Sequence, residues 1–198
     1  MQLAVLASHG GSNLQALIDA VADRRLPLEI ALVLSNNAGA GALERAQNAG
    51  IPTRVINARS HPDAAMRDAA IRDALLEAGA DYVQLAGYMK KLGPRTLAAF
   101  RGRILNIHPA LLPKFGGRGM YGMRVHEAVL AAEERESGAT LHVADSEYDT
   151  GPIVAQERVP VLDGDTPESL AARVLEAEHG LIVDTWRRIA TGQVAISR

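Results

Sequence analysis

Short apolar runs alternate with helical patterns in the first half of the chain. Mainly apolar runs bounded by turn residues predict buried strands at residues 3–7, 30–34, 53–56, 82–86 and 104–107. Between these runs, apolar residues recur at intervals of three and four and predict helices at residues 12–22, 41–49 and 62–78. Buried strands joined by helices form a parallel sheet that is covered on both faces. We therefore expect an α/β fold with a doubly wound, mainly parallel, Rossmann-like sheet.

The pattern changes after this sheet, where a loop rich in glycine and proline covers residues 109–123. The elements predicted beyond it are a helix at residues 125–134, strands at residues 139–144 and 153–159, a helix at residues 167–189 and a short strand at residues 193–196. The two strands separated by a turn predict an antiparallel C-terminal pair, and Thr166 is a suitable N-cap for the long helix. No linker divides the chain, so we expect one domain over residues 1–198.

Composition narrows the class of protein. Of the 198 residues, 47% are hydrophobic and 22% are charged, which is typical of a soluble globular domain. The net charge of −2 gives no basic stripe for nucleic acid. The absence of cysteine excludes disulfides, thiolate metal sites and a cysteine nucleophile. The first apolar run is too short for a signal peptide, and no run is long enough for a membrane span. We expect a cytoplasmic protein without a nucleic-acid or membrane partner.

Binding sites in such sheets lie at the carboxyl ends of the strands. The loop His9-Gly10-Gly11-Ser12-Asn13-Leu14 joins the first strand to the first helix. Amides at a helix N-terminus attract anions, and glycine lets the backbone approach them closely, so the loop is a candidate phosphate site. It matches neither the dinucleotide fingerprint nor the Walker A motif. A tight turn capped by serine or asparagine is the alternative.

The fifth strand ends in Asn106-Ile107-His108-Pro109. Asn106 and His108 point to the same face because side chains alternate along a strand. This pairing suits acyl transfer: Asn106 and a protonated His108 can both donate to the oxyanion that forms, and His108 can carry the protons that the attacking amine loses. The alternative is a capped structural histidine. Asp149 is either a turn residue or, if its hairpin folds over the sheet edge, a carboxylate that favours the imidazolium form of His108.

The other histidines, Trp186 and the Leu112-Pro113 bond have simpler interpretations. His142 lies on a predicted strand and is expected to pack or to orient the backbone. No pair of histidines has the spacing of zinc ligands, so we expect no metal. Trp186 follows Ile182 by one helical turn and is expected in the core. The Leu112-Pro113 bond is a candidate cis peptide.

Several segments together resemble the phosphoribosylglycinamide formyltransferases. They run in the family order and are residues 10–17, 85–89, 105–114, 138–142 and 149–153 and the pair Glu178-His179. The Asn-x-His-Pro-x-Leu-Leu-Pro run is typical of the wider formyl-folate superfamily, and the Gly-Ser-Asn-Leu loop is typical of this branch. Lys90 stands where an arginine is common.

The resemblance implies roles for individual residues. Gly11, Ser12 and Asn13 would bind the substrate phosphate, and Glu178 would bind the amine of glycinamide ribonucleotide. Asn106, His108 and Asp149 would form a catalytic trio. The residues implied for the folate site are Met89, Lys90, Lys91, Leu92, Asn106, Asp145, Ser146, Glu147, Tyr148 and Asp149. Residues 1–100 would form a phosphate-binding half, and residues 101–198 a catalytic and folate-binding half.

The implied donor is 10-formyltetrahydrofolate, the pathway is de novo purine synthesis, and no metal takes part. The partners would be these small molecules, with the protein a monomer or homodimer. Three other functions stay open. Formyl-folate hydrolases and methionyl-tRNA formyltransferases use similar residues but usually carry an extra domain, and a non-catalytic nucleotide-binding module would need no catalytic trio.

Overall fold

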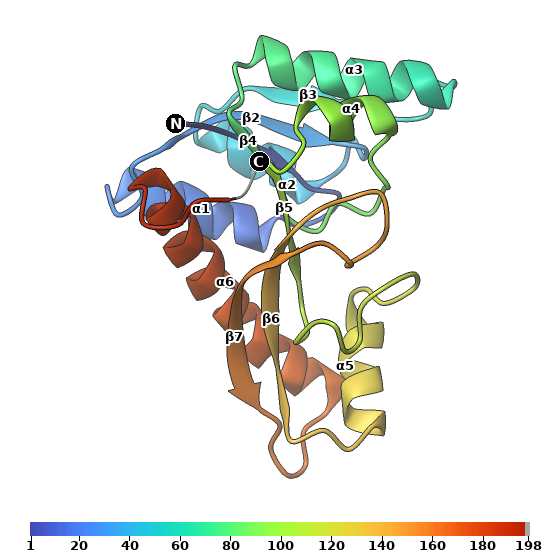
Figure 1. Ribbon diagram of the computed structural model, residues 1–198, viewed down its shortest axis with the longest axis vertical. Helices are drawn as coiled ribbons and strands as arrows, with labels where there is room; N and C mark the ends of the chain where they lie inside the picture. The colour runs from blue at the N-terminus through green and yellow to red at the C-terminus, as the bar shows by residue number, and fades with distance from the viewer. Residues whose placement is uncertain (197–198) are drawn as a thin grey trace.

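The computed structural model describes residues 1–196, and its centre is one seven-stranded sheet (Figure 1). The strands are β1 (Gln2–Leu6), β2 (Glu29–Ser35), β3 (Thr53–Val55), β4 (Tyr82–Leu85), β5 (Ile104–His108), β6 (Glu136–Val143) and β7 (Ile153–Pro160). The helices are α1 (Ser12–Ala22), α2 (Gly41–Asn48), α3 (Ala64–Glu77), α4 (Pro94–Ala99), α5 (Met123–Ala131) and α6 (Pro167–Ala190).

The sheet order is β3-β2-β1-β4-β5-β6-β7. The first five strands of this order are parallel, whereas β6 pairs antiparallel with β5 and β7 pairs antiparallel with β6. This confirms the predicted doubly wound sheet with an antiparallel C-terminal pair. Most predicted elements are present, with ends that shift by up to three residues. Thr166 caps α6 by accepting a hydrogen bond from the Ser169 amide, as predicted. The Leu112-Pro113 peptide is cis, as predicted.

Two predictions of secondary structure are wrong. Residues 193–196 form no strand, because the amides of Gln193 and Val194 both donate to the Arg188 carbonyl and fold the chain back onto the end of α6. The short helix α4 was not predicted, since six residues give too little periodicity to detect. The only local signal for it is Pro94 at its first position, where proline favours helix initiation.

Helices cover both faces of the sheet (Figure 1). On one face, α1, α2 and α6 pack over β1 and β2, and the fully buried Trp186 lies among them as predicted. The indole Nε1 donates to Gln84 Oε1 at 2.7 Å, which satisfies the polar atoms of both buried side chains. On the other face, α3 and α4 contribute Ile71, Leu75 and Leu97 to a second core. A third, smaller cluster joins α5 and α6 to β7.

Helix α4 is held by a side chain from α3. Gly93, the N-cap residue of α4, has no side chain to satisfy the first-turn amides. Asp68 does so instead: its carboxylate accepts from the amides of Arg95 at 2.8 Å and Thr96 at 3.1 Å. It also accepts from the Thr96 hydroxyl at 2.6 Å. Asp68 is 5% exposed, so these contacts are shielded from water and fix the segment that precedes α4.

We expect Asp68→Ala to lower the free energy of unfolding by about 2–3 kcal/mol, because it leaves buried donors at the start of α4 without partners. Asp73→Ala, which removes an exposed carboxylate paired with Arg72, is the matched control and is expected to cost about 0.5 kcal/mol or less. Urea denaturation of both variants measures the difference. Equal losses would contradict the capping role of Asp68.

Candidate active site

The loop between β1 and α1 has the features of an anion site. Gly11 is the N-cap of α1 and has φ of 74°, in the left-handed region that favours glycine. A Cβ at Gly11 would lie 2.7 Å from the Ala42 Cβ, so a larger residue is also excluded by packing. No side chain caps α1, which leaves the first-turn amides of Ser12 and Asn13 available to a ligand.

The side chain of Asn13 connects this loop to α6. Its Nδ2 donates to Glu178 Oε2 at 3.1 Å across 165 residues of sequence. Both side chains are buried, with exposed fractions of 8% for Asn13 and 7% for Glu178. Asn13 Oδ1 accepts no hydrogen bond from any residue in the described range 1–196. Burial raises the pKa of Glu178 to about 7, although the hydrogen bond from Asn13 lowers it.

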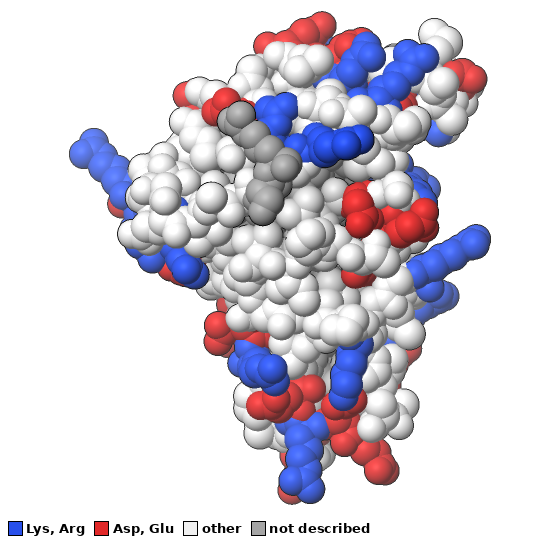
Figure 2. Space-filling view, in the orientation of Figure 1, with Lys and Arg blue, Asp and Glu red and all other residues white. Residues whose placement is uncertain are grey.

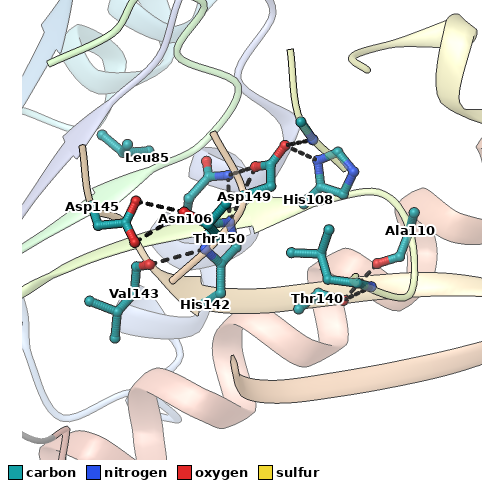
Figure 3. A network of polar contacts seen from close by, with 12 residues as sticks. Leu85, Asn106, His108, Ala110, Thr140, His142, Val143, Asp145, Asp149 and Thr150 are labelled. Carbon is teal, nitrogen blue, oxygen red and sulfur yellow. Dashed lines mark hydrogen bonds and ion pairs between the residues drawn. The ribbon is translucent and has the colours of Figure 1, made fainter. Parts of the chain in front are cut away.

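Asn106, His108 and Asp149 lie together at the carboxyl end of β5 (Figure 3). Asn106 Nδ2 is 3.4 Å from Asp149 Oδ1, and His108 Nδ1 is 3.6 Å from Asp149 Oδ2. The loop after β5 contributes two backbone groups. The amide of Gly117 donates to Asp149 Oδ2 at 2.9 Å, and His108 Nε2 donates to the Phe115 carbonyl at 2.8 Å. The loop between β6 and β7 therefore does bring Asp149 over the sheet edge.

The two titratable groups of this cluster have pKa values below their ordinary ranges. Burial lowers the pKa of His108, and the Asp149 carboxylate opposes this shift without reversing it. For Asp149, burial would raise the pKa, but the adjacent His142 imidazole, the charge of His108 and the hydrogen bond from the Gly117 amide together lower it. The Asp149 carboxylate thus acts in the expected direction, toward the imidazolium form of His108, while burial acts against it.

His142 is the main contact that the sequence interpretation missed. It lies opposite Asn106 in the pairing of β5 with β6. Its Nδ1 donates to the Val143 carbonyl at 3.1 Å, and this assigns the other nitrogen as the acceptor in the neutral ring. That atom, Nε2, lies 3.0 Å from Asn106 Nδ2 and 3.4 Å from Asp149 Oδ1. His142 thus fixes the orientation of the Asn106 amide, and only the strand register could have indicated this.

A cavity adjoins the cluster, between the segment after β4 and the loop after β6. Its lining residues are Leu85, Tyr88, Lys90, Lys91, Leu92, Leu97, Asn106, His142, Ala144, Asp145, Glu147, Tyr148 and Asp149. Of the ten residues implied for the folate site, only Met89 and Ser146 do not line it. Lys91 Nζ is 3.6 Å from Glu147 Oε1 and 5.5 Å from the centre of the Tyr148 ring. The Lys91 side chain, from the segment after β4, thus contacts the loop after β6.

Neither a metal-binding group of side chains nor a membrane-spanning helix is found in the described residues. Within residues 1–196, no group of three His, Asp or Glu side chains is arranged to bind a metal ion. None of the helices in this part of the chain has both the length and the apolar character that crossing a membrane requires.

Comparisons with known proteins identify relatives over nearly the whole chain. Residues 1–186 match the family described as formyl transferase. The chain is 45% identical over 184 residues to the chloroplastic phosphoribosylglycinamide formyltransferase of Arabidopsis thaliana, which covers 92% of this chain and 63% of that protein. It is 42% identical over 195 residues to the trifunctional purine biosynthetic protein adenosine-3 of Bos taurus, covering 98% of this chain and 19% of that protein. The chain thus spans less than two thirds of these relatives.

A solved structure matches over nearly the full length of both chains. The crystal structure of phosphoribosylglycinamide formyltransferase from Brucella melitensis is 43% identical, with a TM-score of 0.88. The match covers 99% of this chain and 98% of that one.

The raised pKa of Glu178 predicts a pH-dependent cost to folding. Because the pKa is 4.5 when the group is solvated and about 7 in the folded protein, the folded state binds more protons between these values. The free energy of unfolding therefore falls as pH rises through this window, by up to about 3 kcal/mol. Glu178→Gln removes this cost, so we expect it to stabilise the protein at pH 8 more than at pH 4.5.

Chemical denaturation at both pH values measures the effect. Glu176→Gln, an exposed change on the same helix, is the control and is expected to show no such difference. If Glu178→Gln changed the free energy of unfolding by the same amount at both pH values, the raised pKa of the buried Glu178 carboxyl would be contradicted.

Proposed function

The chain belongs to the formyl transferase family, and we propose that it transfers the formyl group of 10-formyltetrahydrofolate to the amine of 5-phosphoribosylglycinamide. The products are N-formylglycinamide ribonucleotide and tetrahydrofolate, in de novo purine biosynthesis. One observation carries the proposal: Asn106, His108 and Asp149 meet at the sheet edge, next to the cavity and at the same edge as the uncapped start of α1. The names of the relatives that match most of this chain support the same activity.

The ribonucleotide binds at the loop between β1 and α1. The amides of Gly11, Ser12 and Asn13 bind its phosphate, since a helix N-terminus without a side-chain cap favours an anion. Glu178 accepts a hydrogen bond from the glycinamide amine. A carboxylate suits this role better than a carboxylic acid, and the pKa of about 7 makes the carboxylate accessible near neutral pH.

The folate lies in the cavity beside the catalytic trio. Tyr88, Leu92 and Leu97 supply apolar surface for a flat ring, and polar groups of the loop from Asp145 to Asp149 supply hydrogen bonds. Lys90 and Lys91 at the same cavity offer positive charge to an anionic cofactor tail. Both halves of the chain contribute to each ligand, because the lysines precede residue 100 and Glu178 follows it. Residues 1–198 therefore act as one functional domain.

Transfer proceeds directly between the two ligands. The amine attacks the formyl carbon, a new C–N bond forms, and the bond from that carbon to the folate nitrogen breaks as a proton passes from the amine to this nitrogen. The Asn106 amide donates to the oxyanion. His108 relays the proton that the amine loses to the leaving nitrogen. Asp149 stabilises the imidazolium form of His108.

A cytoplasmic location is proposed from the sequence alone, and a plant relative is named as chloroplastic. On the face drawn in Figure 2, basic side chains are interleaved with acidic ones, which favours small-molecule ligands over an extended tRNA contact.

The activity is tested by mixing the protein with glycinamide ribonucleotide and a 10-formyl folate analogue and following folate release by absorbance. We expect release only when the ribonucleotide is present. Release without it would identify a hydrolase. No release in either case would overturn the transferase assignment and direct attention to methionyl-tRNA or to a binding module.

Asn106→Ala is expected to lower kcat by about a hundred- to a thousandfold, because it removes a donor to the oxyanion. Gln47→Ala, an exposed amide on α2, is the matched control and is expected to leave kcat unchanged. Near-normal turnover by a folded Asn106→Ala enzyme would remove Asn106 from the mechanism.

His142→Phe is expected to lower kcat by about ten- to a hundredfold with little change in KM, because the Asn106 amide loses the acceptor that orients it. The kcat and KM values are measured with both substrates, and thermal denaturation checks that the variant is folded. If KM rises while kcat is retained, His142 serves binding rather than the orientation of Asn106.

A further inference from the structure

Helix α2 contacts the back of the loop between β1 and α1. The amide of Ala42 donates to the His9 carbonyl at 3.0 Å. Arg45 Nε donates to the Gly10 carbonyl at 2.8 Å. Two consecutive carbonyls of the loop are therefore turned toward α2.

The same guanidinium also reaches α1. Arg45 Nη1 donates to Gln15 Oε1 at 2.9 Å, so one side chain joins the loop to the first turn of the helix that follows it. Packing leaves little room at this contact. A Cβ at Gly11 would lie 2.7 Å from the Ala42 Cβ, and a Cβ at Gly41 would lie 3.3 Å from the Gly10 carbonyl oxygen. The loop thus lies directly on the first turn of α2.

A trans peptide points its carbonyl and its N–H in opposite directions. The carbonyl of Gly10 and the amide of Gly11 belong to the same peptide. Because Arg45 holds this carbonyl toward α2, the Gly11 amide points away from α2. The bond from Ala42 to the His9 carbonyl sets the direction of the Gly10 amide in the same way. Two amides of the candidate phosphate loop are therefore oriented from behind.

We propose that Arg45 is a positioning residue for phosphate binding, which holds the Gly10–Gly11 peptide in the orientation that presents the Gly11 amide to a phosphate monoester. The proposal rests on the proposed function, in which this loop binds the ribonucleotide phosphate. A peptide between two glycines rotates at little steric cost, so the loop needs an external contact to keep one orientation. Arg45 supplies this contact through Nε, while Nη1 of the same rigid, planar group binds Gln15 and keeps the guanidinium in place.

The experiment measures binding of ribose 5-phosphate by isothermal titration calorimetry, with the full chain and without the folate. For Arg45→Gln we expect affinity to fall by about tenfold, which corresponds to one charge-assisted hydrogen bond. Arg45→Lys retains the charge but not the two-nitrogen contact, and its affinity is expected to fall by a smaller factor. Gln15→Ala removes only the second contact and tests whether the guanidinium needs to be held.

Binding of the 10-formyl folate analogue to the same variants is the internal control and is expected to be unchanged. In turnover, Arg45→Gln is expected to raise KM for the ribonucleotide with kcat within about twofold, because the loop does not touch the reacting atoms. A merely structural role would instead weaken folate binding and phosphate binding together. Arg72→Gln, which removes an arginine paired with Asp73 on α3, is the matched control.

The outcomes separate this proposal from the proposed function. If the wild-type protein binds ribose 5-phosphate and folded Arg45→Gln binds it equally well, Arg45 has no positioning role, while the phosphate site stands. If the wild-type protein does not bind ribose 5-phosphate, the phosphate site itself is wrong and the proposal falls with it. If Arg45→Gln does not fold, Arg45→Lys decides, since unchanged affinity in that variant would also overturn the two-nitrogen contact.

Discussion

The carboxylate of Asp149 receives contacts from three different segments of the chain. The amide of Gly117 reaches it from the loop after β5, His142 from β6, and His108 from the end of β5. Asp149 itself has φ of 59°, in the left-handed region, where aspartate is better tolerated than most residues. The turn that this conformation makes is what carries the carboxylate over the sheet edge. Without this turn, Gly117, His142 and His108 would have no common partner.

The loop after β5 is fitted closely around this carboxylate. A Cβ at Gly116 would lie 2.4 Å from Leu112 Cδ2 and 3.2 Å from the Asp149 Cβ, so a larger residue there would displace the Leu112 side chain. The next residue, Gly117, then donates its amide to Asp149, while the Phe115 carbonyl accepts from His108. The backbone of a glycine-rich loop thus helps to lower the pKa of the carboxylate and holds the imidazole in place.

Periodicity and turn residues were sufficient to predict the sheet, most of the helices and the common face of Asn106 and His108. These are local properties, since each depends on spacing within one element. The contact of Asp149 could be stated only as a condition, because it depends on where a hairpin lies relative to the sheet edge. The role of His142 depends on the register of β6 against β5, which local sequence does not specify. The pairing of Asn13 with Glu178 joins residues at opposite ends of the chain.

The pKa values of Asp149 and Glu178 shift in opposite directions, for a reason that the sequence could not supply. Asp149 has several donors, and these outweigh the effect of burial, so its pKa is lowered. Glu178 accepts from the Asn13 amide alone within residues 1–196, and burial prevails, so its pKa is raised. Beside it, Asn13 Oδ1 is buried and accepts no hydrogen bond within residues 1–196. A buried acceptor left unpaired costs about 1–3 kcal/mol. A primary amine carries N–H donors for both Asn13 Oδ1 and the Glu178 carboxylate. Its binding would therefore offset the cost of the unpaired Asn13 oxygen, which folding alone does not remove.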